Sequence, residues 1–383
     1  MMRFVSKCSI RKSLLCPSKV TCKLKGTWIN LPPAAASGEM MLTQNGLMHL
    51  FDEIRYEVHG KEIDKVKNVG VVTTIKGFCS FTPSDITRMQ PAGWKHINDN
   101  QTSRDLMDTT EFVALSACMG FFERFRRVLI NCTQSLVLIR SSRDIEAIEL
   151  IQPDESMKTE VNTPANVDLL KHTTVKITKI KWIVKYFEPN VKTELGLMRI
   201  LDGKRWLPLE YQHWVIAVYP LVPQTTHHTW SVRTFSNVEK PRYLLIALGK
   251  EHSILSQSDF HHCTLCNVKA YLNSDEYPYE NYNADFEADK HTSMYNAYTR
   301  FQTIYYGRTN PQPLLDRVHY KNLGPIIVID CSKQNDTVKS STVDLRIDFE
   351  CAKAFPQNTS LYCVIIHDCQ MEYNAFSGEV RKL

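Results

Sequence analysis

Val343–Glu350, with the sequence VDLRIDFE, alternates apolar and charged side chains at every position. Successive side chains of a β-strand point to opposite faces of a sheet, so this stretch predicts a strand with one dry face and one wet face. Strands of this kind are typical of antiparallel sheets that pack on a core from one side. The stretch therefore favours an all-β fold, provided that the same period recurs elsewhere.

The period does recur, in both halves of the chain. Residues 54–58 alternate apolar and charged side chains, and His59-Gly60 then turns the chain into 61–64, which predicts a β-hairpin. In the alternating run 175–186 the apolar face slips by one residue at Thr178-Lys179, as a β-bulge would require. Short runs rich in branched or aromatic residues predict further, more buried strands at 136–139, 243–248, 326–329 and 361–366.

Helical patterns are scarce by comparison. Met294, Tyr298, Phe301 and Tyr305 follow one another at spacings of four, three and four residues, which predicts one core-facing stripe of a helix over 292–306. Shorter helices are predicted at 119–127 and 194–201.

A boundary is expected near the middle of the chain, where Glu188-Pro189-Asn190 ends a strand. We predict a first domain at 1–190, a linker helix at 191–206 and a second domain at 207–383. Many short antiparallel strands with long connections, repeated in two halves, favour two jelly-roll β-sandwiches with a few short helices.

Composition excludes several protein classes. The chain has 383 residues, of which 43% are hydrophobic and 23% charged, and these fractions argue against collagen and against wholesale disorder. The longest apolar run, 214–223, is too short for the roughly 20 residues that span a bilayer, so no membrane span is expected. Twelve cysteines without a secretory leader predict a reducing compartment and a protein that is not secreted.

Positive charge is concentrated at the start of the chain. Seven Lys and Arg residues precede the first acid, Glu39, while the rest of the chain is close to neutral. A basic head can be a nucleic-acid arm, a transit peptide or a solvated end that leads into a strand. The alternation of polar and apolar residues over 19–25 favours the last of these.

Candidate ligand residues are few. His261, His262, Cys263 and Cys266 are residue types that bind zinc, but a structural site needs a second pair at a matching spacing and none follows. We predict instead a turn that leads into a strand at 265–272. Phosphate-binding glycine loops and hydrolase signatures are missing from the sequence. The sequence therefore predicts no catalytic, metal-binding or cofactor-binding residues, and no enzyme activity.

The stretch 271–289 is acidic and rich in tyrosine. Paired carboxylates can hydrolyse glycosides or hold Ca²⁺, and aromatic rings can stack on a sugar. The alternative is a surface loop whose tyrosines pack while its acids stay in water. We favour the surface loop, because no acid in the stretch has the spacing that a site requires.

Read as a string, 271–286, YLNSDEYPYENYNADF, resembles the second-half signature of double jelly-roll major capsid proteins. These proteins belong to nucleocytoplasmic large DNA viruses and to Polinton- or adintovirus-like elements, and the resemblance is closest to double jelly-roll-like proteins of insect and other invertebrate genomes. Four further segments carry it: 42–64, ending in FDEIRYEVHGKEID; 127–141, RVLINCTQSLVLIRS; 219–243, YPLVPQTTHHTWSVRTFSNVEKPRY; and 329–350, IDCSKQNDTVKSSTVDLRIDFE.

The resemblance implies a structural protein without catalytic residues or cofactors. Subunits would form a homotrimer of pseudo-hexagonal outline, and trimers would tile a shell, with other capsid proteins as further partners. Members of the group usually have more chain before the strand that begins here near Lys19. The first strand is therefore expected to be truncated or replaced, and the basic arm Met1–Lys12 to be dispensable for folding and to make weak contact with nucleic acid.

These patterns lead to one hypothesis with two alternatives. The chain is expected to be a capsid-like subunit, an endogenised viral copy in a host genome, located in a virion or in the host cytoplasm or nucleus. The first alternative is a domesticated host protein that binds a partner without forming a shell. The second is a carbohydrate-binding or hydrolytic β-sandwich protein.

Overall fold

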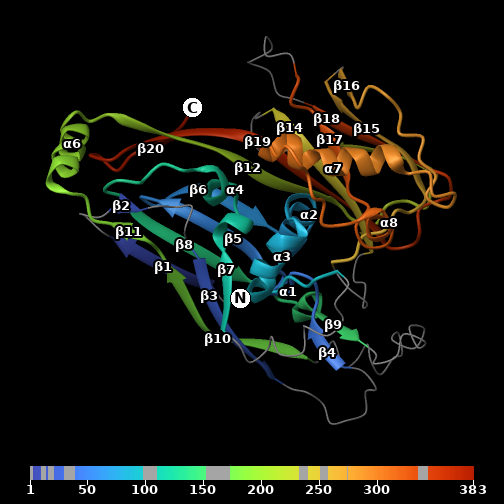
Figure 1. Cartoon of the computed structure of the whole chain (residues 1–383), viewed down its shortest axis with the longest axis horizontal. Helices are drawn as coiled ribbons and strands as arrows, with labels where there is room; N and C mark the ends of the chain where they lie inside the picture. Colours follow the sequence, from blue (N-terminus) through green and yellow to red (C-terminus); the bar gives the residue numbers. More distant parts are fainter. Residues whose placement is uncertain are drawn as a thin grey trace.

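The computed structural model describes residues 3–9, 14–15, 21–29, 39–97, 110–151, 173–232, 240–250, 258–273, 275–334 and 344–383. The fold is all-β with a few short helices, as predicted, and each pair of neighbouring strands is antiparallel. Within the described part, strands β1 to β11 pair only with one another, and so do strands β12 to β20. Figure 1 shows the first set at the lower left and most of the second set at the upper right, with β12 and β19 running above the first set toward helix α6 at one end of the molecule.

The first half contains two main sheets, with strand orders β1-β8-β5-β6 and β10-β3-β7. Two small sheets, β11-β2 and β4-β9, complete it. The strands of this half are β1 Arg3–Ser9, β2 Leu14–Leu15, β3 Thr21–Ile29, β4 Glu39–Leu42, β5 Phe51–Val58, β6 Lys61–Lys67, β7 Thr110–Ala114, β8 Thr133–Arg140, β9 Ile148–Ile151, β10 Thr174–Ile183 and β11 Tyr186–Phe187.

The second half also has two sheets. One follows the order β12-β19-β14-β17, with β20 added to β19, and the other the order β13-β18-β15-β16. Its strands are β12 Trp206–Tyr219, β13 His227–Val232, β14 Pro241–Lys250, β15 Leu265–Leu272, β16 Asp275–Tyr277, β17 Ile327–Asp330, β18 Leu345–Cys351, β19 Thr359–Asn374 and β20 Val380–Lys382. Buried side chains from both halves form one continuous hydrophobic core.

Helices occupy the connections. They are α1 Gly46–His49, α2 Val69–Ser80, α3 Pro83–Met89, α4 Gly120–Arg124, α6 Val191–Asp202, α7 Thr292–Tyr306 and α8 Arg317–Leu323. No helix in the described ranges is long and apolar enough to cross a membrane. The helix predicted at 292–306 is confirmed at both ends, and α4 and α6 fall within or around the two shorter predictions.

Three of the period-2 predictions are confirmed in detail. The β5–β6 hairpin turns at His59 and Gly60, which have φ angles of 50° and 77°. The bulge in β10 lies between Ile177 and Lys179, where its register on β3 shifts. In β18 buried residues alternate with exposed or half-buried ones along the whole strand, although Val343 itself lies outside the described residues.

The basic leader was expected to be a solvated end that leads into a strand near Lys19, and residues 3–9 of it are themselves a strand. These residues form β1, which pairs antiparallel with β8 along its full length, from Arg3 opposite Ile139 to Ser9 opposite Thr133. The strand expected near Lys19 is β3, which begins at Thr21. Residues 1–2, 10–13 and 16–20 of the leader lie outside the described part of the chain.

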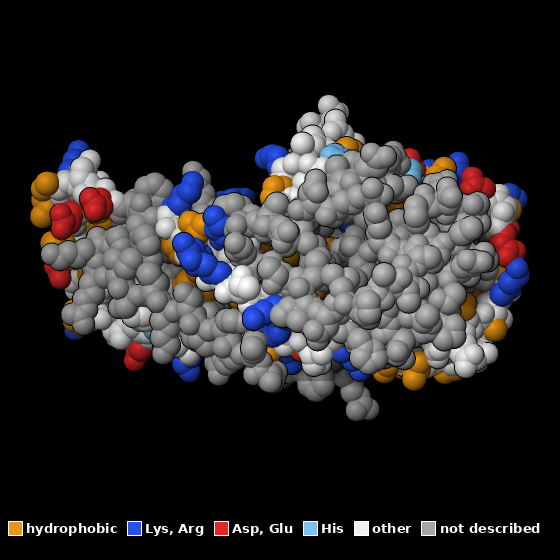
Figure 2. All heavy atoms as spheres, turned by 90° about the horizontal axis from the view of Figure 1, so that it is seen from below, with side chains coloured by type: hydrophobic (Ala, Val, Ile, Leu, Met, Phe, Trp, Pro, Cys, Tyr) orange, Lys and Arg blue, Asp and Glu red, His pale blue; other side chains and the backbone are white. Residues whose placement is uncertain are grey.

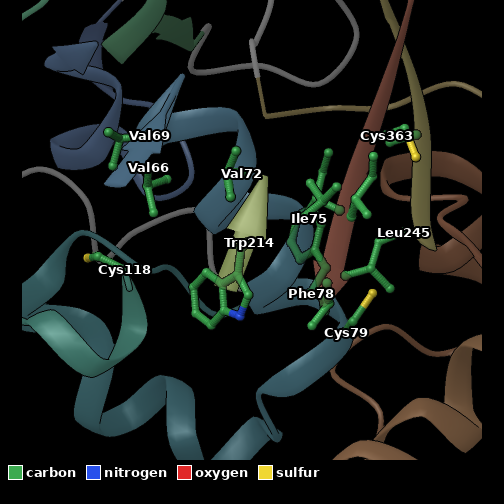
Figure 3. Packing of buried hydrophobic residues seen from close by; sticks show 14 of the residues in the cluster. Val66, Val69, Val72, Ile75, Phe78, Cys79, Cys118, Trp214, Leu245 and Cys363 are labelled. Carbon is green, nitrogen blue, oxygen red and sulfur yellow. The ribbon is translucent and has the colours of Figure 1, made fainter. Parts of the chain in front are cut away.

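Helix α2 was not predicted, because its sequence, VGVVTTIKGFCS, is rich in β-branched residues that favour strands. All of its residues except Val71 are buried. Figure 3 shows its side chains facing Trp214 of β12, Leu245 of β14 and Cys363 of β19, which all belong to the second half. Burial between the two halves therefore outweighs the local propensity for strand.

Candidate functional site

A buried lysine lies where the two halves meet. Lys76, on α2, has only 2% of its side chain exposed. Its ammonium group donates hydrogen bonds to Glu123 Oε1 at 3.0 Å, to Ser80 Oγ at 3.0 Å and to the Tyr306 hydroxyl at 2.6 Å. Glu123 belongs to α4 of the first half and Tyr306 to α7 of the second. One cation thus ties helices of both halves together.

Aromatic rings enclose this ammonium group. Lys76 Nζ lies 4.4 Å from the centroid of the Trp214 ring, 4.5 Å from that of Tyr305 and 5.0 Å from that of Tyr306. Each ring presents electron density to the cation. Burial lowers the pKa of Lys76, and the carboxylate of Glu123 opposes that shift. The rings and the carboxylate together replace the water that the lysine loses.

Both carboxylate oxygens of Glu123 accept hydrogen bonds. Glu123 Oε2 accepts a hydrogen bond from the Tyr305 hydroxyl at 2.7 Å, and Oε1 accepts one from Tyr306 as well as from Lys76. Burial, and then the charge of Glu123, raise the pKa of both tyrosines, so both phenols stay protonated and able to donate. The lysine, the acid and both tyrosines each have a hydrogen-bond partner, so this network can hold a charge in the core.

A second polar contact joins the halves next to the first. The Asp64 side chain, on β6, is 0% exposed. Its Oδ2 accepts from the backbone N–H of Phe121 at 2.8 Å, and its Oδ1 lies 2.6 Å from Nδ1 of His213 on β12. The Tyr211 hydroxyl donates to the carbonyl of Ile63. Strands β6 and β12 are therefore joined by side chains although they share no ladder.

Gly120, the first residue of α4, permits the close approach between the halves. A Cβ atom at this position would lie 1.7 Å from the backbone oxygen of Gln212 on β12 and 3.2 Å from Nε1 of Trp214. A backbone oxygen cannot give way as a flexible side chain can, so only glycine fits here. We refer to these contacts of Lys76, Glu123, Asp64 and Gly120 across the two halves as the junction.

A cavity of about 710 Å³ opens beside the junction. Its walls come from β6, β12 and β13, together with Ile365 of β19. In the described part of the chain, β6, β12 and β13 are each the end strand of a sheet. β6 supplies Glu62, Lys65 and Lys67, and the other two strands supply mainly apolar and aromatic side chains. Lys65 is paired with Glu62 at 2.7 Å. An apolar group that carries an acid would match this lining.

Comparison with known proteins agrees with this geometry. The family described as the double jelly roll-like domain matches residues 40–371. The chain belongs to this family. No curated protein matches the chain.

Solved structures with the same fold are viral capsid proteins. PBCV-1 VP54, fitted into a cryo-electron microscopy reconstruction of the virophage Sputnik, has a TM-score of 0.57 at 11% identity, over 100% of this chain and 92% of that one. The mavirus major capsid protein has a TM-score of 0.57 at 10% identity, over 100% and 87%. The Sputnik virophage structure has a TM-score of 0.56 at 10% identity, over 99% and 85%. At these identities the likeness establishes the double jelly-roll fold.

In this double jelly-roll chain the His261–Cys266 segment forms a turn, as predicted. Cys263 and Thr264 have φ angles of 45° and 51°, and β15 begins at the next residue. The His262 ring stacks on that of Phe286 at 4.7 Å, and its Nδ1 accepts from the backbone N–H of Thr264 at 3.0 Å. No group of three potential metal ligands occurs among the described residues. The absence of a metal site stays a prediction.

The acidic, tyrosine-rich stretch has the features of a surface loop. The Tyr282 hydroxyl donates to the carbonyl of Val328 at 3.2 Å, and burial raises the pKa of Tyr282. Its acids hold surface partners: Glu276 lies 3.1 Å from Lys269, and Asp289 lies 3.1 Å from Arg317. These carboxylates are spread over separate ion pairs, so the geometry gives no support to a glycosidase or Ca²⁺ site.

Sequence reasoning missed the junction. Its members are far apart in the chain, with Lys76 and Tyr306 separated by 230 positions. One local signal was available, because Lys76 is the only charged residue in the twelve-residue run of α2. A lone charge in an apolar run indicates a buried charge with a dedicated partner.

Proposed function

We propose that this chain is a capsid-like structural protein, a double jelly-roll subunit that associates as a homotrimer and tiles a shell. The observation that carries the proposal is the likeness of the fold, over essentially the whole chain, to the major capsid protein of mavirus and to the structures from PBCV-1 and Sputnik. The junction supports it, because a shell subunit with two jelly rolls needs them held at a fixed angle. Further capsid proteins are proposed partners.

The division into domains is part of the same proposal. The first jelly roll would span 1–190, the linker 191–206 and the second jelly roll 207–383. Strand pairing supports this division, since no described ladder joins β1–β11 to β12–β20. Helix α6, Val191–Asp202, supports the linker, because none of its residues is buried.

No catalytic residue and no cofactor are proposed. We further propose that the gene is an endogenised viral copy, with the protein in a virion or in the host cytoplasm or nucleus. Weak contact of the basic leader with nucleic acid would come from a paired strand, β1, rather than from a free arm. A domesticated host protein that binds a partner without assembling is the alternative.

Sedimentation velocity of the purified full chain tests the proposal. The expected particle has three times the 44.2 kDa mass of the chain. Negative-stain microscopy should then show pseudo-hexagonal particles. A monomer at every concentration would contradict the trimer and favour the host-protein alternative.

A further inference from the structure

The outward face of β10 carries a row of lysines. Lys176, Lys179 and Lys181 are exposed, and Lys185 is exposed just beyond the end of the strand. Strand β10 lies toward the lower edge of Figure 1, and Figure 2 views the molecule from that side. Figure 2 shows Lys and Arg side chains gathered on this face. We call Lys176, Lys179, Lys181 and Lys185 the lysine row.

The bulge in β10 creates this row. Strict alternation from Lys176 would turn Thr178 and Ile180 toward the same face. The register shift between Ile177 and Lys179 instead leaves Lys179 and Lys181 exposed and Ile180 half-buried. A bulge re-aims side chains in this way. The irregularity that keeps the apolar face in register thus also collects the lysines on the opposite face.

Neighbouring strands do not neutralise the row. Neither β10, TVKITKIKWI, nor β3, TCKLKGTWI, contains an acid. Lys181 lies directly opposite Lys23 of β3, so this pair of positions places no acid beside the row. Within the described ranges, no lysine of the row forms an ion pair. The charges of the row itself would be balanced by an anion from outside the chain.

The chemistry of the row indicates what kind of anion fits. Lysine binds phosphate as a point charge, and the ammonium groups here follow one strand at intervals of two or more residues, so they match a linear chain of charges. On this strand the aromatic residue, Trp182, is half-buried on the opposite face, so no ring of the described row is placed to stack on a base. Contacts to phosphate without contacts to bases give binding that does not depend on sequence.

We propose that the outward face of β10 binds the phosphate backbone of nucleic acid without reading its bases. The site is distinct from the basic leader. It also does not depend on the proposed shell function, because the lysine row belongs to one subunit.

Fluorescence anisotropy with labelled oligo-deoxythymidine tests this with the full chain. The logarithm of the binding constant should fall with the logarithm of the salt concentration with a slope of about −2 to −3, since three or four contacts to a single strand contribute about 0.7 each. The variant K176Q/K179Q/K181Q should bind at least about tenfold more weakly at low salt, and its slope should be smaller by about 2.

The matched control is K192Q/K290Q/K333Q. It removes three exposed lysines from other surfaces and lowers the net charge equally. The control should bind as the wild type does. Equal losses in both variants would mean that net charge alone drives binding and would overturn the proposal.

Two further measurements check the folding of the β10 variant and the chemistry of the bound anion. Without nucleic acid, the β10 variant should melt slightly higher than the wild type at low salt, because the lysines of the row no longer repel one another. A cooperative melt also shows that the variant folds. Poly-glutamate should compete poorly with the oligonucleotide. Equal or tighter binding of poly-glutamate through the same lysines would assign the face to an acidic protein instead.

A trimer that fails to bind the oligonucleotide would overturn this inference alone. A monomer that binds it through the lysine row would overturn only the proposed assembly.

Discussion

Breaking the Lys76–Glu123 ion pair should weaken the whole molecule. Lys76 is 2% exposed and Glu123 14%, so water cannot fully solvate either charge when its partner is removed. Removal of one member of a buried pair costs about 3–5 kcal/mol. With an unfolding entropy of about 2.1 cal/mol/K per residue over 383 residues, this corresponds to a drop in Tm of about 4–6 °C.

The two single variants should lose different amounts of unfolding free energy. Lys76→Met leaves Glu123 with two tyrosine donors and some exposure, so its cost should lie at or below the lower end of that range. Glu123→Gln leaves an ammonium group in the core with neutral partners only, so its cost should lie at the upper end. The double variant, K76M/E123Q, removes both charges and should cost less than the sum of the single variants by about 2 kcal/mol.

Urea unfolding followed by far-ultraviolet circular dichroism measures all three free energies. Lys353→Met is the control, because Lys353 pairs with Glu287 on the surface, where the side chains are 65% and 58% exposed. Its effect should stay within about 1 kcal/mol. Single variants that each cost less than the control, or a double variant equal to the sum, would refute the view that the junction depends on this pair.

Two other predictions concern the same region. Gly120→Ala should cost about 3 kcal/mol or more, because its Cβ would overlap the backbone of Gln212, whereas Gly196→Ala in exposed α6, where nothing lies within 4 Å, should stabilise by about 0.5–1 kcal/mol in the same urea assay. Burial lowers the pKa of His49 to about 4, so the folded state resists protonation where the unfolded state accepts it. Stability should therefore fall by about 3 kcal/mol between about pH 6.5 and pH 4, and His49→Gln should flatten this slope. An unchanged slope would contradict the assignment.

Strands were predictable because their signal is local. In β18 and in the β5–β6 hairpin, a side chain's position in the sequence decides which face it occupies, so the apolar period reports burial directly. The bulge in β10 was predictable for the same reason, since a one-residue slip of the period has one geometric meaning in a strand. The helical stripe of α7 rests on an equally local rule, the spacing of three and four residues.

Local propensity and hydrophobic period do not predict helix α2. Its β-branched residues favour a strand by propensity, and its two glycines weaken a helix further. Gly70 and Gly77 are nevertheless required, because Cβ atoms there would lie 2.3 Å from the His49 ring and 2.2 Å from Trp94. The helix forms because both of its sides are covered, and that cover comes from segments which the sequence alone does not bring together.

The sequence around each lysine also distinguishes buried Lys76 from the exposed lysine row of β10. Lys76 stands alone in an apolar run, so burial forces it to have a partner, and the partners come from two other helices. The lysines of β10 alternate with apolar residues, so the strand period sends them to water together and leaves their repulsion uncompensated within the described part of the chain. A charge that the fold must satisfy internally stabilises the subunit, whereas charges that the fold gathers on one face without satisfying them favour a partner. Lys76 therefore belongs to the stability of the subunit, and the lysine row to what the subunit binds.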